Sequence, residues 1–212
     1  MRSRRSRRPS WPGPIAVAEL VVARMPANIW LVRHGATEWS VGGRHTGRTD
    51  IPLLPEGRAR ATTLAPALSG HPFSLVLTSP LSRARDTAAL AGFPHAEPEQ
   101  DLLEWDYGDQ EGLTSTQIRE HDPGWSIWWG PISNGEAIDD VATRVRRVLD
   151  RADAAGGDVL LFAHGHVLRM LTAVRLGLPP TSGAHFVLDP ATVSVIGHEH
   201  EWPALLRWNA PP

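Results

Sequence analysis

Blocks of two kinds alternate along this chain. Short apolar runs are typical of buried strands, and they lie at 28–32, 73–80 and 159–163. Segments whose composition or apolar spacing favours a helix follow them, at 55–68, 81–91, 136–155 and from the HGH at 164–166 to 176. Strands that alternate with helices predict an α/β fold, here a three-layer sandwich with a mainly parallel central sheet and helices on both faces.

The C-terminal part of the chain has a different pattern. Three short apolar segments predict antiparallel strands at one edge of the sheet, HFVLD at 185–189, TVSVIGH at 192–198 and ALLRW at 204–208. No internal repeat and no interdomain linker is visible, and 212 residues are enough for one domain with a sizeable core. The expected organisation is one domain over 27–212, preceded by an extension.

Residues 1–26 are expected to be a disordered basic extension. Residues 1–24 hold six arginines and one glutamate, and Met25 offers a second start just before the first strand. A signal peptide is rejected, because the apolar part at 15–23 is short, contains Glu19 and is followed by no small-residue cleavage site. No apolar run approaches the length of about 20 that spans a membrane. We therefore expect a cytoplasmic protein with no membrane partner.

The amino-acid composition excludes several classes of reaction chemistry for this chain. The chain has no cysteine, and all 21 basic residues are arginine, so disulfides, a cysteine nucleophile and a Schiff-base lysine are excluded. After residue 24 the chain holds 15 arginines and 22 acidic residues. An acidic body argues against nucleic acid as a partner, because binding to the phosphate backbone needs a basic face. Whether the chain forms a homodimer is left open.

Charged side chains follow three of the predicted strands. Arg33 and His34 end the first, Arg83 lies just inside the helix after the second, and His164 ends the third. The carboxyl ends of parallel strands meet at one edge of a sheet, where α/β proteins bind ligands. Guanidinium groups and helix N-termini both favour phosphate oxygens. Two alternatives stay open, an exposed salt-bridge face around Arg83 and a metal pair of His164 with His166.

Six blocks of the sequence together resemble a known family. The blocks are RHGATEW, GRHTGRTDIPL, TSPLSRARDTA, LLEWDYGDQEG, NGE and FAHGHVLRML. In this order they resemble the histidine phosphatase superfamily, which includes the cofactor-dependent phosphoglycerate mutases. The resemblance spans about residues 28–176 and implies a phosphoglycerate mutase-like fold.

The resemblance also implies roles for individual residues. It implies that His34 takes the phosphoryl group, that Arg33, Arg83 and His164 complete the phosphate pocket, and that Glu104 protonates the leaving oxygen. An attacking imidazole must be neutral, with its other nitrogen held by a carbonyl group. The cationic pocket needs no metal and no cofactor. The expected contacts to the phosphate and to the rest of the substrate are Ser40, Thr46, Gly47 and Tyr107.

Departures from the mutases favour a phosphatase. Arg119 is the only arginine between Glu111 and Glu136, where mutases carry paired arginines, and the mutase-type HGN is HGH here. The sequence looks most like a subgroup that contains sedoheptulose bisphosphatases and broad acid phosphatases. We expect a phosphomonoesterase of the histidine acid phosphatase type that acts on small phosphorylated metabolites, such as sugar phosphates or bisphosphates. A phosphoglycerate mutase and a non-catalytic phosphate-binding module are the alternatives.

Trp125, Trp128 and Trp129 line a lid or pack in the core, and core packing is favoured for clustered tryptophans. Asp109 and Glu111 are read as ordinary loop acids. The HEH at 198–200 alternates on an edge strand and is read as solvated.

Overall fold

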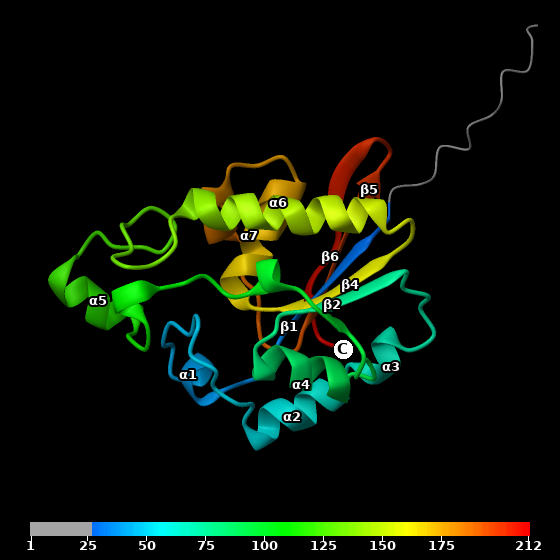
Figure 1. Cartoon of the computed structure of the whole chain (residues 1–212), viewed down its shortest axis with the longest axis horizontal. Coiled ribbons are helices and arrows are strands. Elements are labelled where there is room, and N and C mark those ends of the chain that lie inside the picture. Colours follow the sequence, from blue (N-terminus) through cyan, green and yellow to red (C-terminus); the bar gives the residue numbers. More distant parts are fainter. Residues whose placement is uncertain (1–26) are drawn as a thin grey trace, which may run out of the picture.

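The structure, a computed structural model, describes residues 27–212 and is built around one six-stranded sheet in the order β3-β2-β4-β1-β5-β6 (Figure 1). The strands are β1 (Ile29–Arg33), β2 (Leu75–Thr78), β3 (Glu97–Pro98), β4 (Val159–Ala163), β5 (Val193–Glu199) and β6 (Trp202–Ala210). The pairs β3–β2, β2–β4 and β4–β1 are parallel, whereas β5 runs antiparallel to both β1 and β6. The mainly parallel sheet is therefore confirmed.

Helices cover both faces of this sheet. The helices are α1 (Glu38–Val41), α2 (Pro55–Thr62), α3 (Ala65–Leu68), α4 (Ser82–Leu90), α5 (Ser115–His121), α6 (Ile138–Ala154) and α7 (Gly165–Arg175). Figure 1 shows α6 and α7 on one side of the strands and α2, α3 and α4 on the other.

Side chains alternate along β4 between two core clusters. Val159, Leu161 and Ala163 pack with residues of α6 and α7, whereas Leu160 and Phe162 pack with residues of α3 and α4. Successive side chains of a strand point to opposite faces, so a strand that is apolar throughout needs cover on both. This packing confirms the three-layer sandwich.

Two predicted elements differ from the structure. The helix predicted over 55–68 is two helices, α2 and α3, because Pro66 has no N–H with which to continue the helical hydrogen bonds. The strand predicted over 185–189 is wrong, since a 3-10 helix covers Pro180–His185 and a loop follows it. Both sides of β5 are already paired, with β1 and β6, so no position in the sheet is left beside β5 for 185–189.

The predicted extension, residues 1–26, lies outside the described residues. Between residues 27 and 212, no helix has the length and the apolar character that crossing a membrane requires.

Candidate active site

The predicted strand ends do meet at one edge of the sheet. Arg33 pairs in register with Ala163, and the His34 amide donates to the Ala163 carbonyl at 2.9 Å. The rings of His34 and His164 therefore lie 5.1 Å apart, centroid to centroid. Ser79, which follows β2, donates its amide to the Phe162 carbonyl next to them. Three strands thus deliver the charged residues to one place, as the sequence predicted.

His34 is oriented by its own backbone neighbour. Its Nδ1 lies 2.7 Å from the Gly35 carbonyl oxygen, which can only accept, so Nδ1 carries the proton and Nε2 is unprotonated. Burial, followed by the charges of Arg33 and Arg83, lowers the pKa of His34 well below its usual value. The result is a neutral imidazole with a free nitrogen, as the sequence analysis required of an attacking group.

The glycine after this histidine is required by packing. A Cβ at Gly35 would lie 2.5 Å from the Gly57 carbonyl oxygen of α2, too close for any side chain. The backbone after His34 therefore passes in close contact with α2.

Arg33 is a half-buried cation that uses one of its five N–H groups in a hydrogen bond within residues 27–212. Its Nη1 donates to the Leu188 carbonyl oxygen, and its Nε has no hydrogen-bond partner. A Cβ at Gly165 would be 3.5 Å from Arg33 Nε and 3.8 Å from Glu104 Oε2, so both groups lie beside the start of α7. An unpaired buried donor is costly, and a bound anion would satisfy it. The loop over 186–189, where a strand was predicted, thus holds one side of the site.

Glu104 lies at the N-terminus of α7. Its Oε1 accepts from the amides of Trp105 (3.0 Å) and Val167 (2.9 Å), and its Oε2 accepts from the amide of His166 (3.0 Å). Unpaired N–H groups in the first helical turn favour a carboxylate there. Three of the four lone-pair positions of the carboxylate are occupied, and the free one is on Oε2. This is the position on the carboxylate that residues 27–212 leave open towards the cavity.

Arg83 lies behind the cavity instead of in its wall. It is fully buried and donates to the backbone carbonyls of Thr46, Gly47 and Thr49 and to His164 Nδ1. Its predicted contact with phosphate stays a prediction, since four of its five N–H groups are used by the protein in this structure.

His164 also has both ring nitrogens engaged. Since its Nδ1 accepts from Arg83 at 3.1 Å, its Nε2 carries the proton and donates to Ser79 Oγ at 2.7 Å. Burial is the main reason that the pKa of His164 falls well below its usual value. A contact of His164 with phosphate therefore requires a change in this hydrogen bonding.

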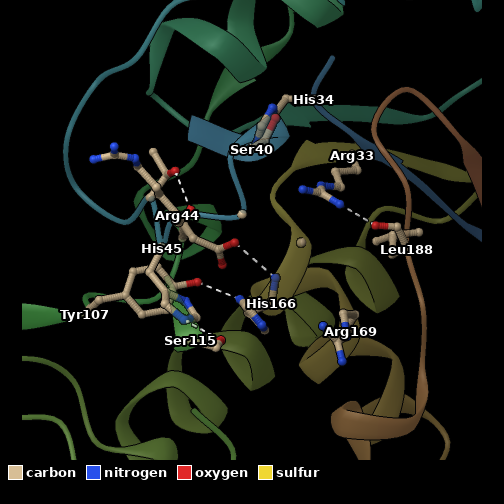
Figure 2. Close-up of a pocket in the computed structure, with 14 residues that line it drawn as sticks. Arg33, His34, Ser40, Arg44, His45, Tyr107, Ser115, His166, Arg169 and Leu188 are labelled. Atoms are coloured by element: carbon tan, nitrogen blue, oxygen red, sulfur yellow. Dashed lines mark hydrogen bonds between the residues drawn. The ribbon is translucent and has the colours of Figure 1, made fainter. Parts of the chain in front are cut away.

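A cavity of about 250 Å³ opens in front of these groups (Figure 2). Six of the predicted site residues line it, namely Arg33, His34, Ser40, Thr46, Glu104 and Tyr107, whereas Gly47, Arg83 and His164 do not. Ser40 is part of a helix cap, since its hydroxyl donates to the Thr37 carbonyl and accepts from the Thr37 amide. Its predicted donation to phosphate needs a rotation of that hydroxyl.

The outer cavity wall contains residues that the sequence did not predict. His45, Ser115, His166 and Arg169 line the cavity, and Tyr107 Oη lies 2.6 Å from His166 Nδ1. Figure 2 shows His166 between Tyr107 and Arg169. The motifs GRHTG and HGH contain His45 and His166, but the spacing of His166 from His164 suggests only a metal pair. Arg169 lies in the block FAHGHVLRML, whereas Ser115 lies in none of the six blocks.

Glu111 was wrongly read as an ordinary loop acid. Its carboxylate accepts from the amides of Gly47 (2.9 and 3.0 Å) and Thr49 (3.1 Å). It fixes the loop whose carbonyl groups hold Arg83. The companion residue Asp109 accepts from the Asn134 side chain on the surface.

The tryptophan cluster divides between core and surface. Trp125 and Trp128 are buried, and their rings lie 5.2 Å from His45 and 5.5 Å from His166 respectively. Trp129 is 66% exposed. Core packing behind the cavity thus accounts for the first two.

A family model matches most of the chain. The model named histidine phosphatase superfamily (branch 1) matches residues 29–211, nearly all of the described chain. The chain belongs to this superfamily.

Curated relatives and solved structures agree with this membership. An acid phosphatase of Mycobacterium tuberculosis is 40% identical over 182 residues, covering 80% of this chain and 86% of that protein. A sedoheptulose 1,7-bisphosphatase of Saccharomyces cerevisiae is 32% identical over 181 residues, covering 70% and 67%. The solved structure of Rv3214 from Mycobacterium tuberculosis has a TM-score of 0.82 and 35% identity, covering 87% and 98%. Together they support an enzyme that hydrolyses phosphate esters and has a phosphoglycerate mutase-like fold.

Chelation tests the metal-independent chemistry expected of this histidine phosphatase. Within 27–212, no group of three or more His, Asp or Glu side chains is arranged to hold a metal ion. The prediction that the HEH at 198–200 lies on an edge strand is wrong, because His198 and Glu199 end β5, which lies between β1 and β6 in the sheet, and His200 lies in the turn that follows. We expect the rate of phosphate release to be unchanged after dialysis against EDTA. A large loss that added Mg²⁺ or Zn²⁺ restores would overturn this expectation.

Acid is expected to destabilise this histidine phosphatase. Burial lowers the pKa of His34, His164 and His166 well below the usual value and that of His45 to about 4. In the unfolded chain these groups titrate near 6.5. As the pH falls from 7 towards 4, the unfolded state binds protons that the folded state does not, so the free energy of unfolding decreases. The decrease is at most about 1.4 kcal/mol per histidine per pH unit.

Urea denaturation at pH 7.0 and 5.5 measures this effect. The His45→Gln variant should show a smaller pH dependence than the wild type, because one of the four groups is removed. An equal pH dependence of the free energy of unfolding in both proteins would contradict the lowered pKa of His45.

Proposed function

We propose that this protein is a phosphomonoesterase that hydrolyses small phosphorylated metabolites through a phosphohistidine intermediate. The observation that carries the proposal is the free Nε2 of a neutral His34 in a cavity that Arg33 and Glu104 also line. A nucleophile, an anion-binding cation and a proton donor are the three groups that a metal-free transfer of this kind needs.

The proposed first step forms a bond between His34 Nε2 and phosphorus and breaks the bond between phosphorus and the ester oxygen. Glu104 gives its proton to that oxygen, so the product leaves as an alcohol. Arg33 balances the charge on the equatorial phosphate oxygens. In the second step Glu104 takes a proton from water, the water oxygen bonds to phosphorus, and the bond to Nε2 breaks. Phosphate leaves, and both groups return to their initial states.

The outer wall suits a hydroxylated leaving group. His45 and His166 are neutral imidazoles, and the Ser115 hydroxyl lies 3.1 Å from His45 Nε2. Such groups donate and accept hydrogen bonds without adding charge, whereas Arg44 and Arg169, which also line the cavity, add positive charge. Relatives named as sedoheptulose bisphosphatase and acid phosphatase support sugar phosphates or bisphosphates as the class. Ser40, Thr46, Gly47 and Tyr107 are proposed to contact such substrates.

Hydrolysis is favoured over mutase activity. Arg119, the one arginine between Glu111 and Glu136, donates its Nε to the Trp125 carbonyl and does not line the cavity. Activity at acidic pH is also proposed, since His34 stays unprotonated well below pH 6.5. A cytoplasmic location, expected from the sequence, belongs to the same proposal.

A turnover screen tests the proposal. Sugar phosphates, bisphosphates and 3-phosphoglycerate are incubated with the enzyme, with and without 2,3-bisphosphoglycerate, and inorganic phosphate is measured. We expect phosphate release that does not require 2,3-bisphosphoglycerate. Isomerised phosphoglycerate that appears only with the bisphosphate would show a mutase instead, and binding without turnover would show a non-catalytic module.

A further inference from the structure

A buried ion pair joins α6 to the loop that carries Glu104. The Arg144 guanidinium meets the Glu136 carboxylate through two bonds, Nε to Oε1 at 2.9 Å and Nη2 to Oε2 at 3.1 Å. The Arg144 side chain is 7% exposed and that of Glu136 is 19% exposed. Glu136 belongs to the NGE block, and neither residue has a role in the chemistry proposed above.

The pair holds the backbone on both sides of Glu104. On the N-terminal side, Arg144 Nη1 donates to the carbonyl oxygens of Asp101 (2.8 Å) and Leu103 (2.6 Å). On the C-terminal side, the amide of Asp106 donates to Glu136 Oε2 at 2.9 Å.

The backbone of Glu136 adds two further bonds. Trp105 Nε1 donates to the Glu136 carbonyl oxygen at 2.8 Å, and the Glu136 amide donates to the Asp106 carbonyl oxygen at 3.0 Å. Residues 103, 105 and 106 are thus all tied to this pair. Glu104 itself is free to direct its side chain to α7.

We propose that Glu136 and Arg144 are positioning residues that hold the Glu104 carboxylate at the N-terminus of α7. This inference rests on the proposed function of Glu104 as the proton donor. Its physical basis is that Glu104 lies in a loop, outside any regular helix or strand. A proton donor must stay within hydrogen-bond distance of the leaving oxygen, and an error of about 1 Å can cost 100-fold in rate.

A neighbouring ion pair provides a matched control. Arg147 is on the same helix and holds the Asp101 side chain of the same loop through two bonds. That pair is more exposed, with the Arg147 side chain 58% accessible, and it does not touch the residues next to Glu104. The Arg147→Gln variant therefore removes a tie between α6 and this loop without removing the proposed positioning contacts.

The test compares wild type, Arg144→Lys, the double variant Glu136→Gln/Arg144→Met, and Arg147→Gln. The double variant leaves no unpaired buried charge, which is the usual reason that a broken buried pair prevents folding. Each protein is assayed on β-glycerophosphate, whose alkoxide needs a proton to leave, and on p-nitrophenyl phosphate, whose nitrophenolate does not. Amide hydrogen exchange is followed at the first turn of α7, where His166 and Val167 donate to Glu104.

In both Arg144 variants we expect faster exchange at this turn and a loss of roughly 10- to 100-fold on β-glycerophosphate, with a much smaller loss on p-nitrophenyl phosphate. Arg147→Gln should leave all three measurements unchanged. Two results would overturn the proposal. One is amide exchange at this turn that is unchanged in the Arg144 variants, and the other is exchange in Arg147→Gln that is as fast as in the Arg144 variants. Faster exchange with equal losses on both substrates would uphold the positioning role and contradict the proton-donor role of Glu104.

Discussion

Replacing His34 with alanine is expected to abolish turnover, by a factor on the order of 10⁴ to 10⁶, as in enzymes that lose a nucleophile or its partner. The reason is that the neighbouring histidine, His164, whose ring lies 5.1 Å away, cannot take its place. His164 Nδ1 accepts from Arg83 and its Nε2 carries a proton, so it cannot attack phosphorus in this arrangement. A rapid acid quench is avoided, since phosphohistidine is acid-labile. The intermediate is measured by denaturing at alkaline pH after a brief incubation with labelled substrate.

Two controls separate this loss from misfolding. His34→Asn keeps a side-chain N–H that can donate to the Gly35 carbonyl, yet it offers no nucleophile, so it should fold and remain inactive. His200→Ala changes an exposed histidine and should retain full activity. Binding of inorganic phosphate by the inactive variants would show that the pocket is intact. Substantial turnover in either His34 variant would refute the covalent mechanism.

The second large effect is expected for Glu104→Gln. General acid catalysis contributes about 10²- to 10⁴-fold, and it is needed only when the leaving group is poor. We therefore expect a loss of that size on a sugar phosphate and a far smaller loss on p-nitrophenyl phosphate. The measurement is kcat for both substrates on one variant. Equal losses on both would mean that Glu104 does something other than protonate the leaving group.

The contacts of Glu104 make the second substrate necessary. A glutamine oxygen can still accept from Trp105 and Val167, but its NH₂ group then faces the His166 amide, which is also a donor. One hydrogen bond is lost, worth about 0.5–1.5 kcal/mol. This damage affects both substrates alike, whereas loss of the proton affects only the poor leaving group. The ratio of the two losses isolates the chemistry.

The sequence by itself determined the layered fold and the convergence of charged residues. Apolar runs of strand length that alternate with helical segments leave few topologies, and parallel strands place Arg33, His34 and His164 at one edge. The motifs also located Glu104. These features are local, because each depends on spacing within one strand, one turn or one motif.

Only the tertiary structure decided what each of these groups can do. Arg83 was predicted to face phosphate, yet the backbone of the loop at 46–49 uses most of its donors. The segment 185–189 has the alternation of a strand, but β5 is already paired on both sides. The Leu188 carbonyl of this segment accepts a hydrogen bond from Arg33 instead. The tie from Arg144 to Leu103 joins residues 41 positions apart. Which donors a protein uses and which it leaves for a ligand depends on such long-range contacts, and no short motif records them.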